Sequence, residues 1–98
     1  MTNYTRQRVI HFVDIYLLIN EYDKAQKFLI IGQKINNKYP YLEQWGYPYI
    51  LEGNLNIQLG NFEKAIKAYH KAIPIQLFTS RLKGALESYY GMSEAYYK

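Results

Sequence analysis

Two stretches of the chain, forty residues apart, carry nearly the same sequence. The segment NEYDKAQKFLIIGQ covers residues 20–33 and GNFEKAIKAYHKAI covers residues 60–73, and they align without a gap. Under this offset Ala25 aligns with Ala65, and bulky residues generally align with bulky ones. Self-similarity at a fixed period of this length is typical of chains built from stacked structural repeats. The offset therefore limits the fold more than any other feature of the sequence.

A second step of forty residues extends the repeat to the carboxyl end. The aligned sets are Val9/Tyr49/Tyr89, Ile10/Ile50/Tyr90, Val13/Gly53/Ser93 and Leu17/Ile57/Tyr97. The 98 residues read as one domain, because a chain of this length supports a single modest core. The repeats fall at about residues 5–40, 41–78 and 79–98, and the third is incomplete.

The middle repeat predicts a pair of helices. Apolar residues recur at three- and four-residue steps over residues 48–59 and again over 62–73, which is the spacing of an amphipathic helix. Gly60 and Asn61 break the pattern between them. We expect Pro74 to end or kink the second helix, because proline lacks the N–H that a helix interior needs.

The same order of signals predicts the remaining helices. Residues 5–19 and 22–37 form one expected pair. A last helix is expected to follow a cap at Thr79 or Ser80 and to run to Tyr97. No stretch alternates with a period of two for long, so the sequence predicts an all-α fold.

These features resemble the tetratricopeptide repeat, whose pattern is W-x2-L-G-x2-Y, then A-x3-F, then P. In the middle repeat the matching residues are Tyr49, Gly53, Ala65, Tyr69 and Ala72. Glu52 and Asn56 depart from the pattern, and the period of forty exceeds the usual thirty-four. The resemblance covers nearly the whole chain. It implies a long-period variant, an α–α superhelix of two full helical hairpins and the first helix of a third.

In such a superhelix the first helix of each hairpin lines the concave face. Three polar residues at the forty-residue spacing, Asp14, Asn54 and Glu94, fall between rows of bulky residues. We therefore predict a groove for a peptide or a protein helix, in which Asp14 and Glu94 favour a basic or amine-bearing ligand. The competing interpretation is a set of solvated helix faces. The predicted lining residues are Ile10, Asp14, Leu17, Ile50, Asn54, Ile57, Tyr90, Glu94 and Tyr97.

The sequence offers no constellation for catalysis. It holds no cysteine and no glycine-rich phosphate loop. His11 and His70 have no second histidine nearby in the sequence, so we expect neither a metal site nor a catalytic base. We therefore predict no catalytic residues, no cofactor and no enzyme activity.

Lysines recur on the second helix of each predicted pair. They are Lys24, Lys27, Lys64, Lys67 and Lys71. Stacked hairpins would align them as a basic stripe, which could contact phosphates. Acidic residues such as Glu21, Asp23 and Glu63 are interleaved, and the net charge of +4 is mild. We therefore expect a solvated surface rather than a nucleic-acid site.

The amino-terminal stretch MTNYTRQRVIHFVDIYLLIN has an apolar part that is interrupted by charge. Arg6, Arg8 and Asp14 lie within it, and it lacks a small-residue cleavage site. It is therefore too polar to span a bilayer and does not read as a signal peptide. We expect no membrane partner and a cytoplasmic location, although a longer parent protein could be exported or anchored.

The last predicted helix ends where a turn and a partner helix should follow. Tyr89, Met92 and Tyr96 would then lack neighbours on one side, which predicts either a fragment of a longer repeat protein or a homodimer through this uncapped helix. The expected function is a non-catalytic module for protein or peptide interaction. The alternatives are a sensory or regulatory segment of a bacterial signalling protein or peptide-responsive transcription regulator, and a purely structural self-assembly unit.

Overall fold

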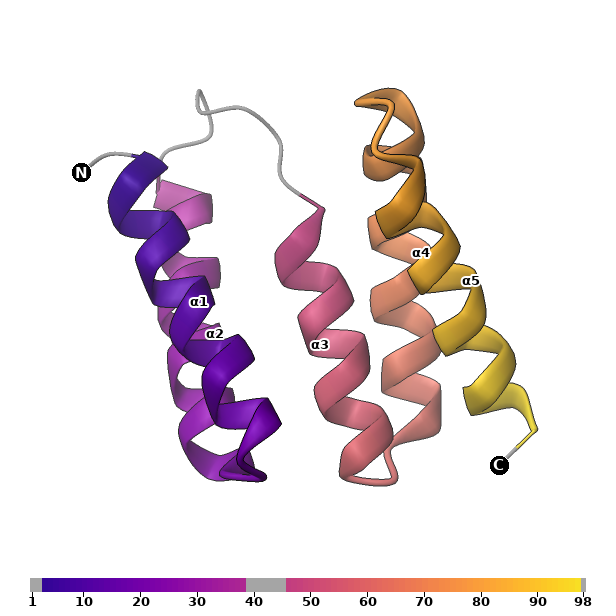
Figure 1. The fold of residues 1–98 in the computed structure, drawn as a ribbon, viewed down its shortest axis with the longest axis horizontal. Helices are drawn as coiled ribbons and strands as arrows, with labels where there is room; N and C mark the ends of the chain where they lie inside the picture. The colour runs from indigo at the N-terminus through magenta and orange to yellow at the C-terminus, as the bar shows by residue number, and fades with distance from the viewer. Residues whose placement is uncertain (1–2, 39–45, 98) are drawn as a thin grey trace. The chain divides into compact units, whose positions relative to one another are not determined.

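The computed structural model describes residues 3–38 and 46–97, and these residues form five helices. The helices are α1 (Asn3–Leu18), α2 (Tyr22–Lys38), α3 (Tyr47–Gln58), α4 (Phe62–Phe78) and α5 (Leu82–Tyr96) (Figure 1). None of the described residues lies in a strand, and the predicted all-α arrangement of helical hairpins is confirmed. The chain divides into an amino-terminal unit, which contains α1 and α2, and a carboxyl-terminal unit, which contains α3, α4 and α5.

Three turns between consecutive helices share one backbone geometry. Each contains a residue with positive φ, namely Asn20 (62°), Gly60 (78°) and Ser80 (59°). The next residue donates its N–H to a carbonyl five positions earlier, in the pairs Glu21–Tyr16 (2.8 Å), Asn61–Asn56 (2.8 Å) and Arg81–Gln76 (2.7 Å). This pattern closes the preceding helix as a Schellman motif. The same local device therefore reverses the chain after α1, α3 and α4.

The predictions near the α4–α5 turn are met only in part. Of the two effects predicted for Pro74, ending the helix is wrong, because Pro74 lies inside α4 and α4 continues to Phe78. The buried Ile73 and Gln76 on either side of Pro74 hold this last part of α4 against the core. The N-cap of α5 is Arg81, which makes no side-chain capping bond, so neither predicted cap residue serves this helix.

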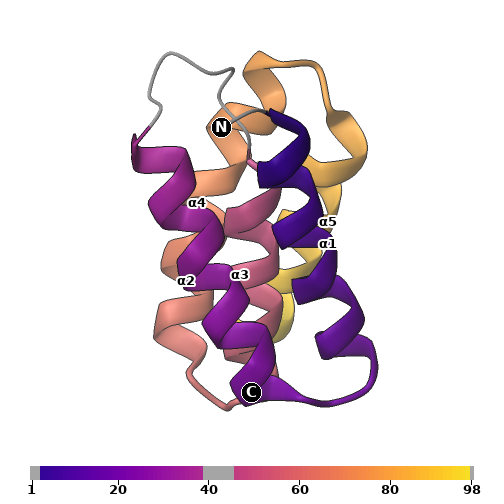
Figure 2. The ribbon, with the colours of Figure 1, turned by 90° about the vertical axis from the view of Figure 1, so that its left-hand side faces the viewer.

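In the amino-terminal unit, α1 and α2 form an antiparallel hairpin (Figure 2). Its buried residues include Ile10, Val13, Ala25, Leu29 and Gly32. A Cβ added to Gly32 would lie only 2.7 Å from Ile10 Cδ1, so glycine permits the two helices to approach closely here. The Phe28 ring packs against two rings of α1, at centroid distances of 5.4 Å from Phe12 and 5.5 Å from Tyr16.

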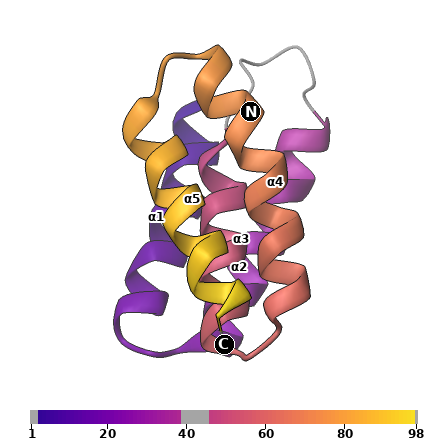
Figure 3. The same ribbon diagram turned by 90° about the vertical axis from the view of Figure 1, so that its right-hand side faces the viewer.

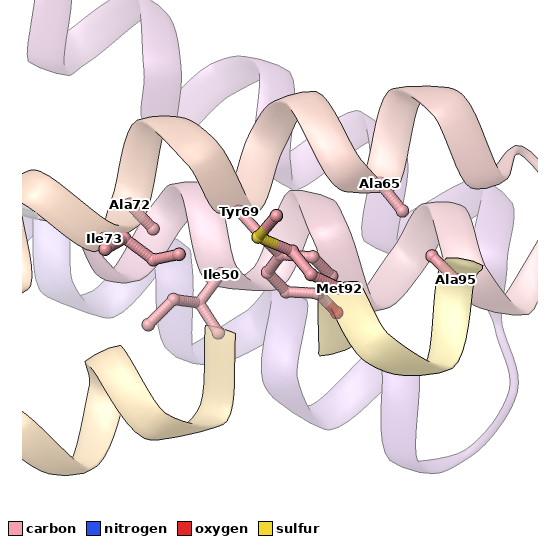
Figure 4. Packing of buried hydrophobic residues seen from close by; sticks show 7 residues of the cluster. All are labelled: Ile50, Ala65, Tyr69, Ala72, Ile73, Met92 and Ala95. Atoms are coloured by element: carbon pink, nitrogen blue, oxygen red, sulfur yellow. The ribbon is translucent and has the colours of Figure 1, made fainter. Parts of the chain in front are cut away.

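In the carboxyl-terminal unit, α4 packs against both α3 and α5, and α3 also contacts α5 (Figure 3). The core cluster of this unit consists of Ile50, Ala65, Tyr69, Ala72, Ile73, Met92 and Ala95 (Figure 4). Tyr69 is the largest of the fully buried side chains. Because Ala65 and Ala72 occupy the neighbouring turns of α4, the large ring has small residues of its own helix on either side.

Two side chains of α4, seven residues apart, are each flanked by two glycines. A Cβ added to Gly53 would lie 2.5 Å from Cζ of Tyr69, and one added to Gly91 would lie 2.6 Å from Cε2 of the same ring. Similarly, Gln76 is flanked by Gly46 and Gly84, and a Cβ at Gly46 would lie 2.7 Å from Oε1.

Seven residues make almost two turns of a helix, so the two arrangements lie on one side of α4. We call them the Tyr69 level, formed by Gly53, Tyr69 and Gly91, and the Gln76 level, formed by Gly46, Gln76 and Gly84. At each level, an α4 side chain fills the space that the missing glycine side chains leave open.

The forty-residue alignment holds only in part in α5. Three residues of α3 and their counterparts in α5 are all buried, in the pairs Pro48/Ser88, Leu51/Gly91 and Leu55/Ala95. Ile10 and Ile50 are also fully buried, whereas Tyr90, which the alignment places with them, is 75% exposed.

Candidate functional site

An open pocket of about 240 Å³ lies among the three helices of the carboxyl-terminal unit, at the Tyr69 level. We call it the Asn54 pocket. Helix α3 contributes Asn54, Ile57 and Gln58, and α4 contributes Tyr69. The α5 wall consists of Glu87, Tyr90, Gly91 and Glu94.

A chain of hydrogen bonds crosses this pocket from α4 through α3 to α5. The Tyr69 hydroxyl donates to Asn54 Oδ1 at 2.5 Å, and Asn54 Nδ2 donates to Glu87 Oε1 at 3.5 Å. Because the phenol can donate only to the oxygen of the amide, this bond directs the amide NH2 group toward α5. The orientation of Asn54 is thus set by a buried residue of the core.

The electrostatic environment of the pocket is negative. Burial raises the pKa of the Tyr69 hydroxyl above its ordinary value, and the carboxylates of Glu87 and Glu94 raise this pKa further. The hydroxyl therefore remains protonated and acts as a donor to Asn54. The same two carboxylates that disfavour a negative charge on Tyr69 would stabilise a positive charge in the pocket. None of the described lining residues is Lys, Arg or His.

The α5 wall follows directly from helical spacing. Tyr90, Gly91 and Glu94 follow Glu87 by three, four and seven residues, so all four residues share one face of the helix. Gly91 is the member of this row that has no side chain, and the Tyr69 ring occupies the space beside it. The close approach that buries the ring therefore also brings the two glutamates to the edge of the pocket.

The structure brings four of the predicted groove residues together in one pocket. Asn54, Ile57, Tyr90 and Glu94 line the Asn54 pocket. Ile10 and Ile50 were predicted to line the groove, but both side chains are fully buried. They are core residues, because their helices turn this row inward rather than toward a ligand.

Three other predicted residues do not belong to the described lining of the Asn54 pocket. Asp14 and Leu17 are half-buried residues of α1, in the amino-terminal unit. Tyr97 follows α5 and is 89% exposed, and it does not belong to the pocket lining. Of the residues predicted to mediate self-association, Tyr89 and Tyr96 are exposed, but Met92 is only 8% exposed and belongs to the core cluster, which corrects its assignment.

Sequence reasoning missed Glu87, Gln58, Tyr69 and Gly91 as pocket residues. The alignment at forty residues compares Glu87 with Tyr47, which gives no indication of a shared polar position. A signal was nevertheless present, since Glu87 precedes Glu94 by seven residues and both flank Tyr90 on a predicted helix. The identity of Tyr69 as a pocket residue depends on packing and has no local signal.

Each lysine of the predicted stripe is exposed, and two of these lysines contact tyrosine rings. Lys24 Nζ lies 5.7 Å from the centroid of the Tyr16 ring, and Lys71 Nζ lies 5.8 Å from that of Tyr49. Across residues 3–38 and 46–97, no group of three or more His, Cys, Asp or Glu side chains is placed to hold a metal ion. In the same ranges, every helix is too short or too polar to cross a lipid bilayer.

Comparisons of this chain with protein families, with curated proteins and with solved structures gave no match. The Asn54 pocket is therefore interpreted from its own geometry and charge.

Proposed function

We propose that the chain is a non-catalytic interaction module, built from tetratricopeptide-like helical hairpins, that binds a peptide or protein segment through the Asn54 pocket. The observation that carries this proposal is the convergence of an oriented amide, two carboxylates and an exposed aromatic ring on one open pocket. Concave sites that combine apolar surface with a few oriented polar groups are the usual form of binding sites.

The chemical groups that line the pocket favour binding of a partner over catalysis. Tyr69, whose pKa is raised, is a weak acid that remains protonated and orients Asn54. The other polar groups of the pocket are the Tyr90 hydroxyl, two amides and two carboxylates; the hydroxyl and the amides can donate or accept hydrogen bonds, and the carboxylates accept them. Tyr90 is 75% exposed and Ile57 is half-buried, so both offer apolar area to a ligand.

The likeness to tetratricopeptide repeats is supported by equivalent positions in the two hairpins. Ala25 and Ala65 are both fully buried, and each donates its N–H to the carbonyl four residues earlier, at 3.0 Å in both cases. Each follows a Schellman turn by the same number of residues. The repeated residues therefore have the same role in both hairpins.

The test is a selection of binding peptides by display on the full 98-residue chain, followed by affinity measurements on two variants. Tyr90→Ala removes an exposed ring of the pocket, and Tyr89→Ala is its matched control, because Tyr89 is exposed but does not line the pocket. We expect the selected peptides to lose about tenfold in affinity with Tyr90→Ala, or 1.4 kcal/mol, and to bind Tyr89→Ala like the wild type. Equal affinities for the two variants, or no selected peptide, would refute the proposal.

A second candidate function is self-association through the outer face of α5. Four large apolar residues of this face are exposed, at spacings of four, three and seven, namely Leu82, Leu86, Tyr89 and Tyr96. Only the exposed Ser93 interrupts this apolar row, and exposed apolar patches often mark interaction surfaces. Sedimentation equilibrium should show a dimer that Tyr96→Asp dissociates, and a monomeric wild type at high concentration would exclude this candidate.

A further inference from the structure

The two carboxylates of the Asn54 pocket are spaced along α5 at a defined interval. Glu87 and Glu94 are seven residues apart on one face of the helix, and a rise of 1.5 Å per residue places their backbone positions about 10 Å apart. Tyr90 and Gly91 lie between them on the same wall. The pocket thus presents two separate negative groups with an exposed aromatic ring in the middle.

The contacts that Glu87 makes leave room for a stronger interaction. The hydrogen bond from Asn54 Nδ2 to Glu87 Oε1 is 3.5 Å long, which is at the weak end of the accepted range. An ionised carboxylate can accept about four hydrogen bonds, and bonds from a guanidinium or ammonium group are the shorter and stronger ones. Both glutamates are exposed, so a partner can reach them from solvent.

The exposed ring of Tyr90 suits the same class of ligand. A cation that lies over a tyrosine ring within about 6 Å of its centroid is stabilised by the electrons of the ring face. Within the described residues this contact occurs between Lys24 and Tyr16 and between Lys71 and Tyr49. The exposed Tyr90 ring offers the same kind of contact to a basic side chain of a partner.

The spacing of the carboxylates also indicates the conformation of the partner. A polyproline II segment has about three residues per turn and rises about 3.1 Å per residue, so side chains three residues apart lie on one face about 9 Å apart. This interval is close to the separation of the two glutamate positions. An extended peptide with basic residues at positions i and i+3 can therefore place one cation at each carboxylate.

We propose that the Asn54 pocket selects basic peptides, in which two arginine or lysine side chains separated by two residues bind Glu87 and Glu94 on either side of Tyr90. This inference rests on the proposed function and specifies the chemistry of the partner. Arginine suits both contacts, because its planar guanidinium group can pair with a carboxylate and stack on an aromatic ring. Acidic peptides are excluded by repulsion from the same carboxylates.

The experiment measures the affinity of labelled peptides for the full chain by fluorescence anisotropy. The first peptide carries two arginines separated by two prolines, and the others replace both arginines by glutamine or by glutamate. We expect the arginine peptide to bind at least tenfold more tightly than the glutamine peptide, and the glutamate peptide to bind more weakly than either. We also expect the preference for arginine to decrease as the salt concentration rises, because exposed charges are screened.

Matched variants of the protein show which carboxylates cause the preference for the arginine peptide. Glu87→Gln and Glu94→Gln each remove one negative charge at nearly constant shape, and each should weaken binding of the arginine peptide about three- to tenfold. The control is Glu63→Gln, which removes the same charge from an exposed residue of α4 outside the Asn54 pocket and should leave the affinity unchanged. Circular dichroism of all three variants checks that the helices are intact.

The outcomes separate the two proposals. Equal affinities for the arginine and glutamine peptides, or equal effects of all three glutamate substitutions, would overturn the selection of basic partners. If display-selected peptides still depend on Tyr90 in that case, the proposed function stands and only the chemistry of the partner is wrong. Equally tight binding of a peptide with two adjacent arginines would overturn the spacing. If no peptide depends on Tyr90, both proposals fail together.

Discussion

At both levels of the carboxyl-terminal unit an α4 side chain lies between two glycines, but the two side chains differ in their hydrogen bonding. At the Tyr69 level a rigid ring lies between two glycines, and its hydroxyl donates to Asn54 at the pocket. At the Gln76 level a flexible amide lies between two glycines, and Gln76 Oε1 makes no hydrogen bond to any residue of the described ranges. At the Tyr69 level the buried side chain is hydrogen-bonded to a residue of the pocket, whereas at the Gln76 level the buried amide oxygen is only packed between its neighbours.

The comparison shows that close helix approach does not by itself create a site. Glycines flank the α4 side chain at both levels, and each would meet that side chain if it carried a Cβ. The pocket forms where the buried side chain ends in a donor and the neighbouring α5 face carries carboxylates. The same kind of substitution is therefore expected to change stability more at the Tyr69 level than at the Gln76 level.

The largest expected effect is that of truncating the ring. Tyr69→Ala should lower the free energy of unfolding by about 3–5 kcal/mol, because it leaves a ring-sized cavity in the core cluster. It should also abolish peptide binding, since Asn54 loses the bond that orients it. Urea denaturation followed by circular dichroism measures the change, and a loss below about 1 kcal/mol would show that the ring is not the centre of this core.

The glycines should differ in their tolerance of alanine. Gly91→Ala should lower the free energy of unfolding by about 1–3 kcal/mol, because the new Cβ would overlap the Tyr69 ring and α3 at Gly53 confines the other side of that ring. Gly84→Ala should cost less than about 1 kcal/mol, since the Gln76 amide can rotate away and alanine favours a helix by about 1 kcal/mol over glycine. The same urea experiment compares the two variants. Equal costs would remove the distinction between the levels.

Removing only the hydroxyl should have a moderate effect that depends on pH. Tyr69→Phe should cost about 0.5–1.5 kcal/mol at neutral pH, the usual value of one hydrogen bond. Because the pKa of Tyr69 is raised in the folded chain, the contribution of the hydroxyl is complete below the ordinary pKa of 10.0 and decreases as the pH rises above it.

Parallel urea titrations of the wild type and the Tyr69→Phe variant over alkaline pH test this sign. The stability difference between the two proteins should be constant below pH 10.0 and should narrow above it, since the unfolded chain loses the Tyr69 proton first. A difference that widens with pH would show that the folded protein prefers the phenolate. The negative field assigned to the pocket would then be wrong.

The smallest expected effect belongs to the Gln76 level. Gln76→Met replaces the amide with a flexible apolar side chain of similar length. It should raise the free energy of unfolding by between zero and about 1 kcal/mol. The reason is that a buried amide oxygen without a partner among the described residues costs free energy. Thermal unfolding is sufficient to detect the change. A loss above about 1 kcal/mol would show that the amide has a stabilising partner, and the contrast with Tyr69 would fail.

The sequence predicted the helices and the repeat because both depend on local signals. Ala25 and Ala65 follow equivalent turns, and Gly60 supplies the positive φ that ends α3. Asn54 and Glu94 were predicted as groove residues from their forty-residue spacing, and both line the Asn54 pocket.

The parts that could not be predicted depend on contacts between helices. The contacts of Gly53 and Gly91 with the Tyr69 ring depend on how α3 and α5 pack on α4, and no local sequence signal indicates them. Ile10 and Ile50 were misplaced for the related reason that period alone does not say which apolar row faces inward.

The binding role of the Asn54 pocket is tested most directly by an NMR titration of the isotope-labelled full chain with the two-arginine peptide. We predict that chemical-shift changes concentrate in residues 54–58 and 87–94, and include the side-chain amide of Asn54. Residues 60–64, which line a second pocket at the α3–α4 turn, should not respond. Changes centred on residues 60–64 or on α2, with an unmoved Asn54 amide, would contradict the assignment of the site.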